Sequence, residues 1–83
     1  MANLYTGEIN TNGEYQTLAS LTGLTFENNT KYVIQIQNQV LIREGEDGEG
    51  FLINYPIPIQ FTKKTDDLYI KTTGAGCVVN IAN

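Results

Sequence analysis

Apolar and polar residues alternate along many short segments of this chain, and this period of two limits its possible folds more than any other feature. The clearest segment is residues 31–37, KYVIQIQ, in which Tyr32, Ile34 and Ile36 occupy one face of a strand. No stretch keeps apolar residues at i, i+3, i+4 and i+7 for longer than about one helical turn. The alternation therefore predicts an all-β fold.

Turn residues separate the alternating segments about every 8–12 residues, as they do in β-sandwiches and small barrels. We expect about eight short strands, forming a small antiparallel β-sandwich or a jelly-roll-like barrel, with residues 1–83 as a single domain. The expected strands are residues 3–9, 14–21, 31–37, 40–44, 51–54, 57–62, 68–73 and 77–82. Residues 51–54 and 57–62 form either one broken strand or two short ones, and the last two strands form a pair across GAG.

The core is expected to come from Ile34 and Ile36 of the middle strand and from Leu68 and Ile70 near the C-terminal end, with Leu24 and Phe26 turned inward from a loop. A chain of 83 residues buries only about 63% of its unfolded surface. Area burial then barely offsets the entropy of ordering the chain. Contacts between subunits are therefore expected to contribute to stability.

Residues 55–61, YPIPIQF, place two prolines inside an apolar segment. Because Pro56 and Pro58 are two positions apart, both remove N–H donors from the same lateral edge of a strand. The segment is therefore interpreted as an edge strand with one blunted side, and Tyr55, Pro56 and Pro58 are its candidate edge or interface residues. An extended polyproline-type loop is the alternative.

Charge narrows the classes of partner. Nine acidic and five basic residues give a net charge of −4, which disfavours binding to nucleic acid or to an anionic membrane surface. No apolar run approaches the 18 residues or more of a membrane span. The start, MANLYTGEIN, lacks a basic segment followed by an apolar stretch, so no signal peptide is expected and synthesis in a cytoplasm is the simplest interpretation.

The sequence offers little for catalysis. It has no histidine to act as a base, and its single cysteine, Cys77, lies in an apolar segment where a buried structural thiol is expected. Asp66 and Asp67 are adjacent, so their side chains would point to opposite faces of a strand, and a solvated turn is the expected setting. We therefore expect no catalytic residues, no bound metal and no cofactor.

Two further groups have a binding interpretation beside a structural one. The acidic residues Glu44, Glu46, Asp47 and Glu49 offer oxygen ligands for calcium, but their spacing does not match a twelve-residue calcium loop, so a flexible hairpin tip is expected. Five tyrosines would form a sugar-stacking platform if they were exposed. A carbohydrate-binding β-sandwich module therefore remains an alternative function, although most tyrosines in strands serve packing.

Three stretches together carry a family resemblance: LYTGEI near the start, LTGLTFENNTKYVIQIQN in the middle, and DDLYIKTT followed by CVVNIAN at the end. They resemble small accessory virion proteins of tailed bacteriophages, of the kind that decorate heads or form head fibres. The resemblance implies a non-enzymatic β-sandwich that is made in the bacterial host cytoplasm. It also implies assembly as a homo-oligomer, most often a trimer, and binding to a capsid or fibre protein in the virion.

Overall fold

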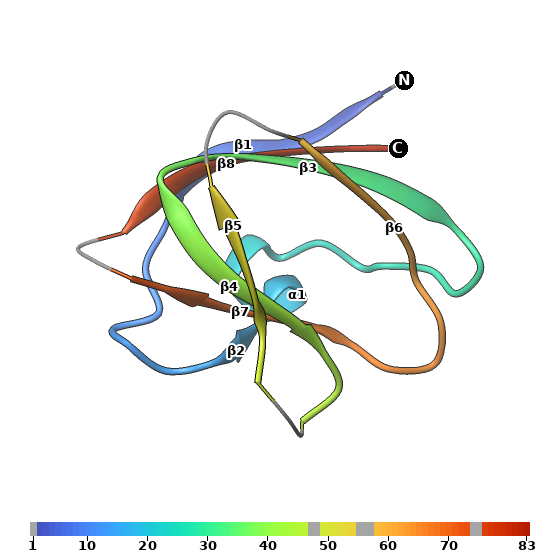
Figure 1. The fold of residues 1–83 in the computed structure, drawn as a ribbon. Coiled ribbons are helices and arrows are strands. Elements are labelled where there is room, and N and C mark those ends of the chain that lie inside the picture. The colour runs from blue at the N-terminus through green and yellow to red at the C-terminus, as the bar shows by residue number, and fades with distance from the viewer. Residues whose placement is uncertain (1, 47–48, 55–57, 74–75) are drawn as a thin grey trace.

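The expected all-β sandwich is confirmed by a computed structural model, which describes residues 2–46, 49–54, 58–73 and 76–83. Two antiparallel sheets of four strands face each other (Figure 1). The described elements are β1 (Asn3–Ile9), β2 (Gln16–Thr17), α1 (Leu18–Thr22), β3 (Lys31–Gln37), β4 (Gln39–Glu44), β5 (Phe51–Asn54), β6 (Ile59–Thr62), β7 (Leu68–Thr72) and β8 (Cys77–Ala82).

The strand order has a simple rule. The first sheet runs β1-β8-β3-β6 and the second runs β2-β7-β4-β5. Strands from the two ends of the chain pair in succession, β1 with β8, β2 with β7, β3 with β6 and β4 with β5. The additional pairs β3–β8 and β4–β7 fold this long two-stranded ribbon into two layers. This is the strand order of a jelly roll, one of the two layouts expected from the sequence.

The core lies between the two sheets and follows the alternation of the strands. In β3, Tyr32, Ile34 and Ile36 are buried, whereas the residues between them are not. Leu68 and Ile70 are buried from β7. The four core residues expected from the sequence are therefore confirmed, and further buried apolar side chains come from every layer: Ile9, Leu18, Val40, Ile42, Cys77, Val79 and Ile81.

An aromatic cluster holds one loop and β6 onto β3. The rings of Phe26 and Tyr32 meet edge to face with centroids 4.9 Å apart, and the rings of Tyr32 and Phe61 stack at 5.5 Å. The Tyr32 hydroxyl also accepts a hydrogen bond of 2.8 Å from the backbone N–H of Glu27. Leu24 and Phe26 pack against the core, so their expected inward orientation is confirmed.

The expected strand over residues 14–21 is wrong except at Gln16–Thr17. Only Gln16–Thr17 forms a strand, and Leu18–Thr22 forms the short helix α1. Thr17 caps this helix by accepting a hydrogen bond from the Ser20 N–H, and Gly23 ends it with φ of 75°. A capping threonine and a C-terminal glycine are the signals that outweigh a period of two over so few residues.

Another strand boundary and one strand pairing also differ from expectation. Within the segment expected over residues 57–62, the described strand is Ile59–Thr62; Pro58, which has no N–H to offer, precedes its last residue pair with β3, and residue 57 lies outside the described residues. The expected pair of residues 68–73 with 77–82 is also wrong, since β7 and β8 lie in different sheets. The chain crosses from one layer to the other between them.

A buried pair of threonines joins the two sheets. Thr11 follows β1 of the first sheet, and Thr72 ends β7 of the second. The Thr72 N–H donates to the Thr11 Oγ1 at 2.9 Å, the Thr11 N–H donates to the Thr72 Oγ1 at 3.3 Å, and the two hydroxyls lie 3.1 Å apart. Each side chain thus satisfies a buried backbone donor of the other residue.

Candidate functional site

The two lateral sides of the sandwich differ. At one side lie the edge strands β1 and β2, and α1 packs against β1, β2 and β7 with Leu18 fully buried. At the other side, bordered by the edge strands β5 and β6, lies a cleft of about 410 Å³. Its lining is mostly apolar, with charged side chains at the rim: Ile42, Arg43, Glu44, Glu49, Phe51, Ile59, Phe61 and Leu68.

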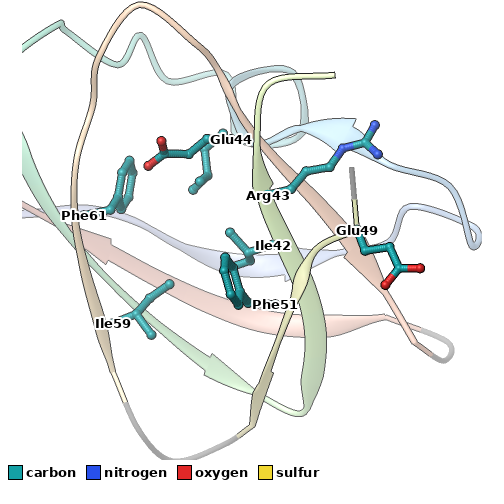
Figure 2. A pocket seen from close by; sticks show the side chains of 8 residues that line it. Ile42, Arg43, Glu44, Glu49, Phe51, Ile59 and Phe61 are labelled. Carbon is teal, nitrogen blue, oxygen red and sulfur yellow. The ribbon is translucent and has the colours of Figure 1, made fainter. Parts of the chain in front are cut away.

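Phe51 is the main exposed feature of this cleft. It lies opposite Ile42 in the β4–β5 register, so both side chains are on the inner face of the second sheet. Figure 2 shows Phe51 beside Ile42, with Ile59 and Phe61 of β6 across the cleft. Yet Phe51 is 77% exposed, whereas Ile42 is 6% exposed. A phenylalanine on the core side of a sheet is thus left without cover from the described part of the chain.

The next residue of β5 is exposed on the opposite face. Leu52 lies opposite Leu41, on the outer face of the second sheet, and is 52% exposed. Among the described residues, the exposed large apolar side chains are Leu4, Phe51 and Leu52. Two of the three are therefore neighbours on one edge strand. We call Phe51, Leu52 and Ile53 the β5 edge.

The β5 edge lacks the features that usually protect an edge strand, which are charged side chains, prolines and very short length. The strand Phe51–Asn54 contains no charged residue and no proline. By contrast, β2 is only two residues long, β6 is preceded by Pro58, and β1 carries the exposed Glu8. Of the four edges, β5 is thus the one best suited to add another strand.

The outer face of the second sheet also carries charged side chains that lie over tyrosine rings. The Arg43 guanidinium carbon lies 3.9 Å from the ring centroid of Tyr15 and 5.5 Å from that of Tyr69, and the Lys71 Nζ lies 4.9 Å from the Tyr15 centroid. Such cation–π contacts hold the rings in place. The Tyr15 hydroxyl accepts a hydrogen bond of 3.0 Å from the N–H of Gly50, which also fixes the segment leading into β5.

Tyr69 links this face to the acidic tip. Its hydroxyl donates a hydrogen bond of 3.3 Å to the Glu46 Oε1. The pKa of Tyr69 is raised above its usual value, mainly by partial burial and to a smaller extent by the charge of Glu46. Asp66 and Asp67 are exposed between β6 and β7, with Asp66 in a bend, as expected for a solvated turn. Asp47 lies outside the described residues, and the described ones contain no group of three side chains placed to hold a metal ion.

Lys63 is buried, and its ammonium group is held by nearby oxygen atoms. Its Nζ donates to the Asn28 Oδ1 at 2.8 Å and to the backbone oxygen of Lys64 at 2.9 Å, and it lies 3.9 Å from a carboxylate oxygen of Asp67. The backbone of Lys63 also bonds to Asn29 and Thr30. These contacts tie the loop before β3 to the turn after β6, which gives Lys63 a structural role.

Of the residues proposed from the sequence as edge or interface candidates, only Pro58 lies among the residues that the structure describes. Tyr55 and Pro56 fall outside the described residues. Pro58 is exposed and immediately precedes β6, which borders the cleft. The β5 edge itself was missed. Its signal in the sequence is the uncharged run FLIN directly after the acidic GEDGEG, an apolar strand without a protecting charge.

Cys77 is buried, as expected, and lies opposite Ile9 in the β1–β8 pair. Burial, and to a smaller extent the charge of Glu8, raises the pKa of its thiol. The raised pKa means that the folded chain favours the neutral thiol over the thiolate. The stability that the neutral Cys77 thiol contributes is therefore complete below the unfolded pKa of about 8.5 and is lost as the pH rises through the folded pKa.

We therefore expect the free energy of unfolding to fall more steeply above pH 9 for the parent chain than for a Cys77→Ala variant. Urea denaturation at several pH values measures both profiles. The folded thiol should also react with a disulfide reagent far more slowly than the thiol of the urea-unfolded chain. Parallel pH profiles together with fast labelling of the folded chain would contradict the buried thiol.

No helix in the described segments is long and apolar enough to cross a membrane. Comparison with models of known protein families, with curated proteins and with solved structures finds no match to this chain.

Proposed function

We propose that this chain is a non-enzymatic structural protein of a bacteriophage virion, a capsid-decoration or head-fibre component, which acts as a homo-oligomer. The observation that carries the proposal is the β5 edge, where Phe51 is 77% exposed on the inner face of a sheet. An uncovered core-side aromatic next to a free strand edge suits assembly with another chain. The length of the chain supports this argument as well, because 83 residues bury a smaller fraction of their unfolded surface than a larger domain does.

The virion setting is supported by two features. The sequence stretches quoted above resemble phage accessory proteins, and jelly-roll strand orders are common in viral capsid domains. The groups most suited to chemistry support a structural role, since the Cys77 thiol is buried and the Lys63 ammonium is held by neighbouring oxygens.

Native mass spectrometry and light scattering of the purified chain test the assembly. We expect a homo-oligomer in the micromolar range. Mass spectrometry of phage particles purified from a lysate of the source strain tests the setting, with peptides of this chain expected in intact particles. Particles that lack these peptides, in a lysate that contains them, would reject the virion assignment but not the oligomer.

The two prolines that precede β6 in the sequence give a separate prediction. Replacement of Pro56 and Pro58 by threonine restores two N–H donors next to an edge strand, so aggregation or altered assembly is expected while the far-UV circular dichroism stays unchanged. Dynamic light scattering over several days measures the outcome. A double variant as homogeneous as the parent would show that these prolines do not protect the edge.

A carbohydrate-binding module is the second candidate, because lectin domains also use jelly rolls and because Tyr15 and Tyr69 are only half-buried. The cations close to both rings leave less ring face for a sugar to stack on. A glycan array with the parent chain and a Tyr69→Ala variant tests it. Binding that is lost in the variant would favour this candidate.

A further inference from the structure

We propose that two copies of this chain associate through the β5 edge, with β5 of one copy pairing antiparallel to β5 of the other around a two-fold axis at Leu52. This surface rests on the homo-oligomer of the proposed function and names its contact. The occupant is a second copy because this register places apolar side chains opposite apolar side chains across the junction. The virion resemblance implies three copies, whereas this contact uses the same strand twice and therefore joins two.

Two-fold pairing with Leu52 on the axis gives every described β5 side chain an apolar neighbour. Leu52 meets Leu52 of the second copy on the outer face, and Phe51 meets Ile53 of the second copy on the inner face. Within each chain, Leu41 lies opposite Leu52, Ile42 opposite Phe51, and Val40 opposite Ile53. Rows of four apolar side chains then cross the junction, and the uncovered Phe51 gains a neighbour on the core side.

Charge also favours this register. The chain carries a net charge of −4, so two copies repel each other, and an uncharged contact surface avoids adding close pairs of like charges to this repulsion. The strand Phe51–Asn54 has no charged residue. Glu49 at the rim is three positions from Leu52, so antiparallel pairing keeps the two Glu49 carboxylates about 20 Å apart along the strands. A parallel arrangement would place them side by side.

The size of the contact sets its expected strength. The exposed parts of Phe51 and Leu52 supply roughly 240 Å² from each copy, under a third of the about 800 Å² that each partner buries in a standard interface. Backbone hydrogen bonds between the two edges add to this. A dissociation constant in the micromolar range is therefore expected, rather than the nanomolar range of larger interfaces.

The first test replaces Leu52 by lysine. Two lysines would then face each other on the axis, so the dissociation constant measured by sedimentation equilibrium should rise about 100-fold. Leu4→Lys is the matched control, since Leu4 is an exposed leucine on the edge strand β1, and it should leave the constant unchanged. Circular dichroism of both variants checks that the fold is kept.

The second test retains the surface and uses Leu52→Cys. Residues opposite each other in antiparallel strands have Cα atoms about 4.5–5.5 Å apart, within the range of a disulfide. Mild oxidation should therefore produce a covalent dimer, whereas Leu4→Cys and the parent chain, whose Cys77 is buried, should remain uncrosslinked.

The outcomes separate this surface from the proposed function. An oligomer that persists in Leu52→Lys and yields no disulfide in Leu52→Cys would overturn the β5 contact while leaving the homo-oligomer in place. A parent chain that stays monomeric up to about 500 µM would overturn both, because a micromolar contact would be populated there. A monomeric parent chain is also the result expected if the β5 edge pairs only with a strand of a different protein.

Discussion

Replacement of Ile70 by alanine is expected to lower the free energy of unfolding by about 2–5 kcal/mol. Ile70 has no exposed surface and lies in β7, an interior strand that pairs with β2 on one side and β4 on the other. Loss of its side chain leaves a cavity between the sheets that neighbours in two strands cannot fill without moving. Urea denaturation followed by circular dichroism measures the change.

The same loss is expected for Ile34, Ile36 and Leu68, and Leu4→Ala is the control, because Leu4 is 37% exposed. A small domain has only about 5–15 kcal/mol of stability in total, so the core variants are expected to be partly unfolded at modest temperature. Changes below about half a kcal/mol at all four core positions would mean that the buried face of these strands is assigned wrongly.

Replacement of Thr11 by valine is expected to cost about 1–3 kcal/mol, although valine has nearly the same shape. The variant removes the acceptor of the buried Thr72 N–H, which has its bond of 2.9 Å to the Thr11 hydroxyl. A buried N–H without an acceptor lowers stability by the full free energy of removing that group from water. Thermal unfolding measures the loss, and hydrogen exchange should show lower protection of the Thr72 amide.

The reverse variant, Thr72→Val, removes the acceptor of the Thr11 N–H. Because both single variants also break the bond between the two hydroxyls, the double variant should cost about 1 kcal/mol less than the sum of the singles. Thr25→Val, at an exposed position, is the control and should change stability by less than about 0.5 kcal/mol. Strict additivity would show that the two hydroxyls do not interact.

The sequence was most informative where alternation is long. Seven residues of β3 alternate without a break, so the face of Ile34 and Ile36 could be assigned from the pattern. Over residues 16–22, two strand residues and five helix residues share one short stretch, and local capping by Thr17 decides between them. The pairing of β7 with β4, rather than with its neighbour β8, depends on contacts across the whole chain that no local pattern records.

The candidate site was only partly predictable, for a related reason. Pro58 immediately precedes β6, which is an edge strand, whereas Pro56 lies outside the described residues. The exposure of Phe51 depends on which elements cover each side of the sandwich. The helix α1 packs at the side opposite β5 and therefore does not cover Phe51. An apolar residue in a strand is expected to be buried, so its exposure became visible only in three dimensions.

The nested strand pairing has a consequence for how the chain is made. β8 is an interior strand between β1 and β3, and the two ends of the chain lie side by side, with Ala2 and Asn83 exchanging backbone hydrogen bonds of 3.0 and 3.1 Å (Figure 1). During translation, the first sheet therefore cannot close until residues 77–82 have left the ribosome. Until then, the edges of β1 and β3 that pair with β8 in the folded chain stay unpaired. Folding then depends on long-range contacts, which form slowly.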